Sequence, residues 1–156
     1  MNTVVIGIGN PYRRDDGVGP AVAAAISERA LPGVRVLNGI EDPMRLLDAW
    51  SGAALALLID AVTASPSMPG RIRRVTADDV AAASGVSSHS LNIAQVFALG
   101  QALGRVPDQL VVFTVDAADI GHGVGLTPKV AAAVPDVVGA AVAEIVSRSA
   151  EQPYGK

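Results

Sequence analysis

The stretch that most constrains the fold is residues 4–19, VVIGIGNPYRRDDGVG, close to the N-terminus. A run of β-branched residues ends at two glycines, a polar turn with two adjacent carboxylates follows, and an Ala-rich helical pattern begins at Gly17. This order predicts a strand, a loop and the start of a helix. In an open α/β fold, ligands bind at the loop that leaves the carboxyl end of a strand. Asp15 and Asp16 are therefore candidate functional residues.

The rest of the chain alternates strand patterns with helix patterns. Strands are predicted over residues 34–37, 54–59, 71–75 and 110–115, helices over 18–29, 44–50, 91–103 and 128–147, and a helical turn over 78–83. The run 54–59 is apolar throughout, which is typical of a central strand buried on both faces. The run 71–75 alternates charged with apolar residues, as an edge strand does. Asp42 with Pro43 predicts a helix cap and Gly104 a helix end.

Together these elements predict an α/β protein with helices on both faces of a largely parallel sheet. Right-handed crossovers make the first three strands parallel. If the first strand lies between the second and third, a crevice opens there, and the loop with Asp15 and Asp16 lies beside Asp60, which follows the third strand. A length of 156 residues fits one domain. We expect it to span 1–150, with 151–156 as a flexible tail.

Composition excludes several classes of partner. The chain has 12 basic and 15 acidic residues, and its net charge of −3 argues against nucleic acid. It has no Cys, and therefore no disulfide and no thiolate ligand of its own. No apolar run approaches the roughly 18 residues of a membrane span, and the N-terminus does not resemble a signal peptide. We expect a soluble cytoplasmic protein without membrane contact.

Two carboxylates and one histidine stand out as candidates for chemistry, and each also has an ordinary structural explanation. Of the adjacent pair Asp15 and Asp16, we expect one to cap or hydrogen-bond and the other to face the crevice. Asp60 is either a solvated turn residue or part of the site. His89, among serines at the start of a predicted helix, is either a helix-start residue or a ligand. Two carboxylates and one histidine from these three loops could bind a divalent metal ion with open positions, whereas His122, in a flexible glycine-rich segment, is assigned no role.

Other common signatures are absent or incomplete. The chain has no G-x-S-x-G elbow, no H-E-x-x-H and no P-loop, so serine hydrolases, zincins and nucleotide triphosphatases lack their motifs. Gly7 and Gly9 resemble a dinucleotide-binding turn, but Tyr12 stands where the third small residue belongs. A bulky ring there would obstruct close packing of helix on strand. We therefore expect no organic cofactor, and nucleotide binding stays a minor alternative.

Four motifs in order, GIGNPYRRDDGVG, LLIDAV, SSHSLN and GVGLTPKV, resemble the hydrogenase maturation proteases. These endopeptidases trim the C-terminus of the large-subunit precursor of nickel-iron hydrogenases. The resemblance covers nearly the whole chain. It implies a three-layer α/β/α sandwich with a mixed, mostly parallel five-stranded sheet, in which the first strand lies between the second and third and the edge strand is antiparallel.

The resemblance also implies a role for three residues. Asp16, Asp60 and His89 match the family's metal-binding acid, aspartate and histidine, which are thought to recognise nickel already inserted in the precursor. On these grounds we expect Asp16 to face the crevice and Asp15 to cap or hydrogen-bond. Substrate cysteines then supply most nickel ligands, in agreement with a protease that has none. Asp16 and Asp60 are the implied catalytic residues, and a carboxylate or a metal-polarised water attacks the peptide carbonyl. GVGLTPKV is expected to be structural.

Two departures from the family pattern concern substrate choice. Asp16 stands where some members have Glu, and residues 38–43, NGIEDP, replace a Gly-Thr-rich turn of many members. The alternative functions are a nickel-dependent chaperone or checkpoint that binds the precursor without cutting it, and a nucleotide-binding α/β protein. We expect a monomer whose partner is the large-subunit precursor.

Overall fold

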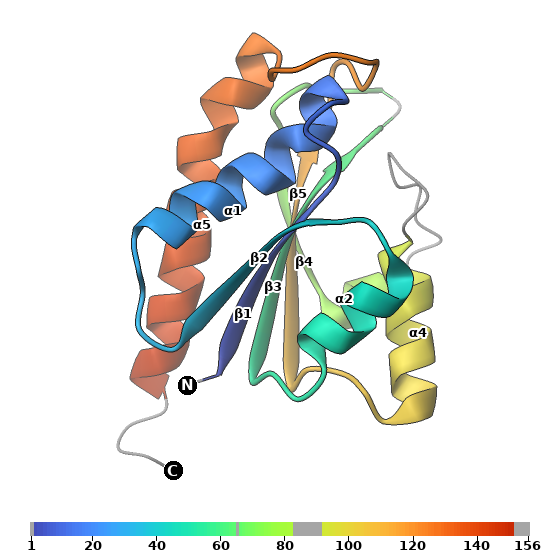
Figure 1. Cartoon of the computed structure of the whole chain (residues 1–156), viewed down its shortest axis with the longest axis vertical. Coiled ribbons are helices and arrows are strands. Elements are labelled where there is room, and N and C mark those ends of the chain that lie inside the picture. Colours follow the sequence, from blue (N-terminus) through green and yellow to red (C-terminus); the bar gives the residue numbers. More distant parts are fainter. Residues whose placement is uncertain (1, 65, 83–91, 152–156) are drawn as a thin grey trace.

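The computed structural model describes residues 2–64, 66–82 and 92–151 of the chain (Figure 1). The strands are β1 (Thr3–Ile8), β2 (Val34–Ile40), β3 (Leu55–Val62), β4 (Ile72–Thr76) and β5 (Gln109–Asp116). The helices are the 3₁₀ helix η1 (Arg14–Gly17) and the α-helices α1 (Val18–Glu28), α2 (Pro43–Trp50), α3 (Ala77–Ala82), α4 (Ile93–Leu103) and α5 (Pro128–Glu151).

The five strands form one sheet in the order β2-β1-β3-β5-β4. β1 pairs with β2 and β3 in parallel, and β3 pairs with β5 in parallel. Only β4 of these strands is antiparallel, against β5. The predicted position of the first strand between the second and third, and the antiparallel edge strand, are confirmed. The carboxyl ends of β1, β2, β3 and β5 therefore lie at one end of the sheet, called here the carboxyl edge.

Helices cover both faces of the sheet and make two separate cores. α1 and α5 lie on one face, and α2 and α4 lie on the other (Figure 1). Alternation along a strand sends successive side chains to opposite faces, so in β3 Leu57 joins the α1/α5 core and Leu58 the α2/α4 core. The second core contains the T-shaped pair of Trp50 and Phe97, with ring centroids 6.0 Å apart. The predicted three-layer sandwich is confirmed.

Residues near the helix ends predicted most of these ends correctly. The side chain of Asp42 accepts a hydrogen bond from the Met44 N–H at 3.0 Å, so the predicted cap of α2 is confirmed. Gly104, with φ of 67°, ends α4 in the left-handed conformation that favours glycine. The predicted ends of two strands were too early: β2 extends to Ile40, and β3 extends through Asp60 to Val62.

Two glycines bring α1 against the sheet. A Cβ on Gly19 would lie 2.3 Å from the Ile8 carbonyl oxygen and 2.5 Å from that of Ile59. A Cβ on Gly7 would lie 2.6 Å from the Gly19 carbonyl oxygen. No side chain fits into either space, because real contacts of this kind exceed 3 Å. The start of α1 is thereby held against the carboxyl ends of β1 and β3.

Helix α5 differs from expectation in its length and apolarity. Its segment Pro128–Arg148 is long and apolar enough to cross a membrane, contrary to the prediction that no run approaches that length. One such helix is weak evidence, since the core helix of a soluble protein passes the same test. In this fold one side of α5 packs into the α1/α5 core through Val130, Ala133, Val137, Val138, Ala141 and Ile145. The helix therefore has a packing role that accounts for its apolarity.

Candidate functional site at the carboxyl edge of the sheet

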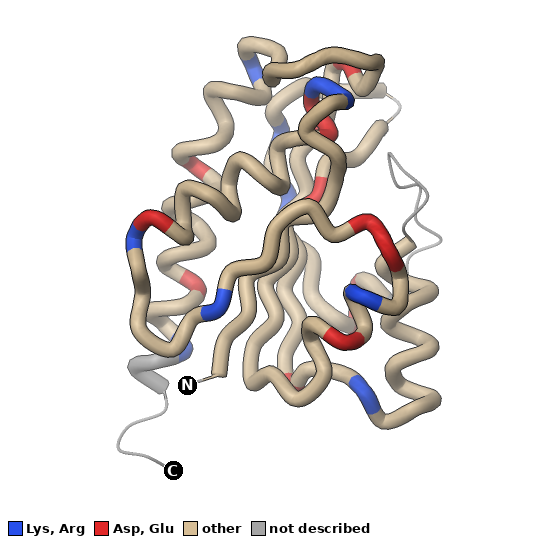
Figure 2. Tube along the Cα trace, viewed as in Figure 1, with Lys and Arg blue, Asp and Glu red and all other residues tan. Residues whose placement is uncertain are grey.

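Buried carboxylates gather at the carboxyl edge. Among the described residues, the buried acidic side chains are Asp15, Asp16, Asp60 and Asp116. The first two belong to η1 after β1, the third lies near the end of β3, and the fourth ends β5. Figure 2 shows acidic positions on the connections at this end of the sheet. Burying a charge is costly unless it is paired or hydrogen-bonded, so the partners of each carboxylate indicate its role.

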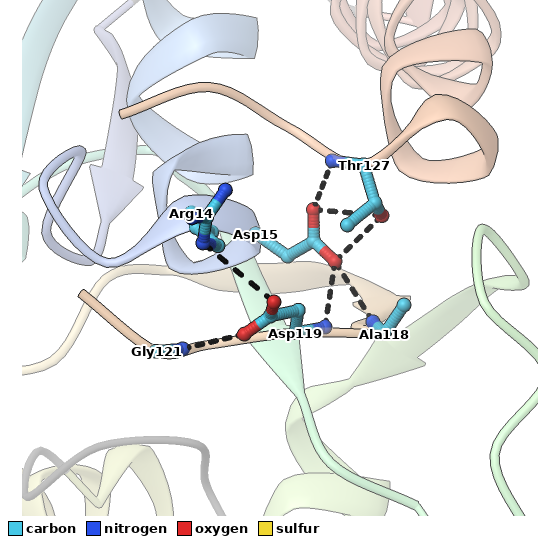
Figure 3. A network of polar contacts seen from close by, with 6 residues as sticks. All are labelled: Arg14, Asp15, Ala118, Asp119, Gly121 and Thr127. Carbon is cyan, nitrogen blue, oxygen red and sulfur yellow. Dashed lines mark hydrogen bonds and ion pairs between the residues drawn. The ribbon is translucent and has the colours of Figure 1, made fainter. Parts of the chain in front are cut away.

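Asp15 is bound on both oxygens by donors from the distant segment 118–127 (Figure 3). Oδ2 accepts hydrogen bonds from the backbone N–H groups of Ala118 at 2.8 Å and Asp119 at 3.0 Å. Oδ1 accepts from the Thr127 N–H at 2.7 Å, and the Thr127 hydroxyl lies within 3.0 Å of both oxygens. Asp15 thus joins the loop after β1 to the loop after β5, and the predicted hydrogen-bonding role is confirmed.

The protonation equilibrium of Asp15 reflects these donors. Burial alone would raise its pKa, but hydrogen bonds from Thr127, Asp119 and Ala118 outweigh burial and hold the pKa below the ordinary value of an aspartate. The charged form is therefore the one that the fold stabilises. A carboxylate so fully occupied is suited to structure rather than to proton transfer.

Asp16 has a different environment from its neighbour. Its Oδ2 accepts a hydrogen bond from the Asn10 backbone N–H at 2.9 Å, which closes the loop over Gly9. Its helix, η1, packs against β3, the strand that carries Asp60. The two predicted carboxylates therefore come from contacting elements at one edge of the sheet, although they are 44 positions apart in the sequence.

Asp60 lies inside β3, where it pairs with Thr114 of β5. The interpretation of Asp60 as a solvated turn residue is wrong, because the side chain is only 2% exposed. By alternation it points to the same face as Leu58, which is the face covered by α2 and α4. A carboxyl group buried near the end of an otherwise apolar central strand is a functional-site candidate.

The structure describes two of the three residues of the predicted metal site. His89 falls between α3 and α4 in the sequence and lies outside the described residues. Within residues 2–64, 66–82 and 92–151, no three His, Cys, Asp or Glu side chains are close enough to hold a metal ion. The assignment of Asp16, Asp60 and His89 as ligands therefore stays a prediction.

Asp116 is a buried carboxylate that sequence reasoning missed. Its Oδ2 accepts from the Met68 N–H at 3.3 Å and lies 3.8 Å from Nη2 of Arg73. Its Oδ1 has no hydrogen-bond partner among the described residues. Since Asp116 pairs with Val62, its side chain points to the same face as Asp60. The only available signal was its place at the end of a strand, and it was assigned to the loop that follows.

The turn after β1 does not have the free amides of a phosphate-binding loop. Each N–H from position 9 to position 16 donates to a protein oxygen, apart from Pro11, which has none. The acceptors belong to Ile40, Asp16, Asn10, Gly123, Asp119 and Arg13. Phosphate cradles rely on amides that point at the ligand, so the geometry opposes nucleotide binding here.

The expectation that the Tyr12 ring would obstruct packing of the helix on the strand was wrong. Tyr12 is 69% exposed, and Gly7 and Gly19 make the close packing of helix on strand.

A comparison with protein families adds an independent line of evidence. The model of a family described as hydrogenase maturation protease matches residues 20–144, which is most of the chain. The chain belongs to the hydrogenase maturation proteases. It is accordingly a hydrolase that acts as an endopeptidase, and the resemblance found in the sequence motifs is confirmed.

Curated relatives agree with the family match. The hydrogenase 2 maturation protease of Escherichia coli K12 is 28% identical over 138 residues, which covers 86% of this chain and 84% of the relative. The hydrogenase expression/formation protein HupD of Bradyrhizobium diazoefficiens is 30% identical over 133 residues, which covers 81% of this chain and 69% of the relative. The similarity extends over most of each protein.

Solved structures of maturation proteases have the same fold. The hydrogenase maturating endopeptidase HybD of E. coli superposes with a TM-score of 0.84 at 23% identity, covering 95% of this chain and 94% of that chain. An endopeptidase of E. coli gives a TM-score of 0.83 at 26% identity, covering 92% and 91%. The arrangement described above is therefore that of the maturation protease fold.

Proposed function

We propose that this maturation protease removes the C-terminal extension of a nickel-iron hydrogenase large-subunit precursor after nickel has been inserted. The observation that carries the proposal is the presence of two buried carboxylates, Asp16 and Asp60, on contacting elements of a maturation protease fold. The names of the relatives support hydrogenase maturation as the process. The large subunit and the timing after nickel insertion are our proposal.

Asp16 and Asp60, together with His89, are proposed to contact nickel carried by the precursor. Carboxylate and imidazole groups bind divalent transition metals. The chain has no Cys, so any thiolate around nickel must come from the substrate. Nickel is in this proposal part of the substrate. Contact with it would place the scissile bond beside the carboxylates only when the metal has been inserted.

The chain's own residues position the two carboxylates and supply the groups for hydrolysis. The Asn10 N–H holds Asp16, and β3 holds Asp60 within the sheet, so both carboxylates are positioned before substrate binds. A positioned carboxylate can take the proton of an attacking water or attack the peptide carbonyl itself. Asp16 and Asp60 are the proposed catalytic residues for either step. We further propose that the enzyme works as a monomer in the cytoplasm, where its precursor is folded.

The test is the intact mass of a large-subunit precursor after incubation with the enzyme, in nickel-loaded and nickel-free forms. We expect a C-terminal peptide to be lost from the loaded form alone. Loss from both forms would contradict the nickel requirement while leaving the protease assignment in place. Binding without cleavage of either form would replace this proposal with the checkpoint function. Absence of both binding and cleavage would show that the substrate is a different protein.

A further inference from the structure

The exposed hydrophobic side chains of this protein are unevenly distributed. Among residues whose side chains the structure describes, the large hydrophobic ones that are exposed are Tyr12, Met44, Met68, Leu99, Leu103, Val124 and Val146. Four of them follow strands at the carboxyl edge: Tyr12 after β1, Met44 after β2, Met68 after β3 and Val124 after β5. We call these four residues the apolar rim. Tyr12, Met68 and Val124 lie on connections between elements, whereas Met44 lies in the first turn of α2.

Hydrogen bonds join three of the rim connections to the carboxyl edge. The Gly123 N–H donates to the Tyr12 carbonyl at 2.9 Å, and the Arg14 N–H donates back to the Gly123 carbonyl at 3.0 Å, so Tyr12 and Val124 belong to paired segments. The Met68 N–H donates to Asp116 at the end of β5. Asp15 adds its bonds to Thr127 and Ala118. The rim is therefore built on connections that are held in place.

The exposure of these side chains is not needed for the fold. Tyr12 is 69% exposed, Val124 75%, Met68 56% and Met44 51%, so each leaves most of its apolar surface in water. Single exposed hydrophobics are ordinary, but several at the same end of the sheet favour a contact surface for another protein. Tyr and Met are also enriched at protein interfaces, Tyr as a rigid contact and Met as an adaptable one.

We infer that the apolar rim binds an apolar surface of the substrate protein. This surface belongs to the folded part of the substrate, from which the scissile segment extends. The inference rests on the proposed function, because the occupant is the folded large-subunit precursor. The rim is continuous with the proposed site. The connection that carries Tyr12 also carries Asp16, and the connection that carries Met68 follows β3, the strand of Asp60. A peptide cut at these carboxylates necessarily brings its parent protein against the surrounding connections. Rim contacts would then supply affinity, and the carboxylates would supply chemistry.

The experiment measures the dissociation constant of nickel-loaded precursor for a Tyr12→Ser, Met68→Ser and Val124→Ser triple variant. The matched control is a triple variant of exposed hydrophobics elsewhere, Leu99→Ser, Leu103→Ser and Val146→Ser, on α4 and α5. We expect the rim variant to bind at least roughly tenfold more weakly, since interface anchors commonly cost more than 1 kcal/mol each on truncation. The control is expected to bind within about twofold of wild type, and its thermal unfolding checks that both variants are folded.

A second readout separates affinity from chemistry. With saturating precursor, the rim variant should cleave at a rate within about threefold of wild type, because the carboxylates are unchanged. Equal dissociation constants for wild type and rim variant would overturn the inference, whether or not wild type cleaves. If wild type binds the precursor through the rim but never cleaves it, the inference stands and the proposed function fails. A wild-type dimer that the rim substitutions dissociate, with unchanged precursor binding, would assign the rim to a second copy of the chain and overturn the inference.

Discussion

The two ends of the sheet are built from the same strands and differ in what they bury. At the amino end, short connections make ordinary backbone bonds, such as the Ala54 N–H to the Asn2 carbonyl at 2.8 Å and the Asp108 N–H to the Ala53 carbonyl at 2.8 Å. At the carboxyl edge lie the four buried carboxylates and the four rim residues. A fold selected only for stability has no reason to collect buried charge and exposed apolar surface at one end. The difference supports the proposed site at the carboxyl edge.

A second contrast lies within the carboxyl edge itself. Asp15 has donors on both oxygens from a segment more than 100 positions away and binds two loops together. Asp16, its immediate neighbour, accepts a hydrogen bond from the Asn10 N–H and lies on an element packed against β3. Adjacent carboxylates thus divide into a structural residue and a candidate catalytic residue. The predictions below separate these roles.

The largest effect is expected for Asp60→Asn. This substitution keeps the shape of a side chain buried in β3 but removes its charge. If Asp60 contacts the nickel of the precursor or takes part in peptide hydrolysis, processing should fall by roughly 100-fold or more. Thermal unfolding of the same variant, measured in parallel, separates a loss of chemistry from a loss of fold. Processing within threefold of wild type would show that Asp60 has no catalytic part.

Asp15→Asn should have the largest effect on stability. Its Asn amide cannot accept all the bonds made by Ala118, Asp119 and Thr127, so unfolding free energy should decrease by about 2–4 kcal/mol. Urea titration measures this loss. Asp119→Asn is a suitable control, since Asp119 is exposed and should change stability by less than about 1 kcal/mol. An equal loss in both variants would refute the structural role of Asp15.

The same residue predicts a dependence of stability on pH. The pKa of Asp15 is lower in the folded than in the unfolded chain, so its contribution is fully present above the unfolded value and is lost as pH falls through the folded pKa. Wild type should therefore lose more unfolding free energy than Asp15→Asn between about pH 5 and pH 3. Urea titrations across this range test the sign. Parallel curves for the two proteins would contradict it.

A smaller effect is expected for Asp116→Asn. One carboxylate oxygen of Asp116 has no partner among the described residues, and Arg73 is 3.8 Å from the other. Loss of the weak pairing and relief of a buried charge act in opposite directions, so unfolding free energy should change by less than about 1 kcal/mol. Chemical denaturation measures it. A loss as large as that of Asp15→Asn would mean that Asp116 also holds the carboxyl edge together.

The smallest effect is expected at the amino end. The Asn2 side chain donates to the Gly52 carbonyl at 3.2 Å on the exposed surface. Asn2→Ala should change unfolding free energy by no more than about 0.5 kcal/mol and leave processing of the precursor unchanged. A substantial loss of processing would contradict the assignment of function to the carboxyl edge alone.

Much of the fold could be predicted because its signals are local. The apolar run of β3, the Asp42-Pro43 cap and the closing Gly104 each specify an element through nearby residues. Strand ends were predicted less well, since the third strand was predicted to end at Ile59 and continues three residues further, to Val62. Backbone pairing with β5 determines where β3 ends, and the polarity of the residues in β3 does not indicate this end.

The site was harder to predict because its bonds are long-range. The sequence singled out Asp15 and Asp16 as a pair, but Thr127, which binds Asp15 from 112 positions away, belongs to the segment GVGLTPKV, which was expected only to be structural. Asp116 resembled a loop residue, because nothing local indicates burial at the end of β5. The family motifs supplied the choice of Asp16, Asp60 and His89, which the order of residues alone left open.

The most direct test of the account compares Asp15→Asn with Asp16→Asn. Asn at position 16 can still accept the Asn10 N–H, so this variant should unfold near the wild-type temperature while its processing rate on nickel-loaded precursor falls by roughly 100-fold. Asp15→Asn should lose stability and, at a temperature where it is folded, process within about fivefold of wild type. The reverse pattern, with Asp16→Asn active and Asp15→Asn stable but inactive, would contradict the division of roles between the two carboxylates.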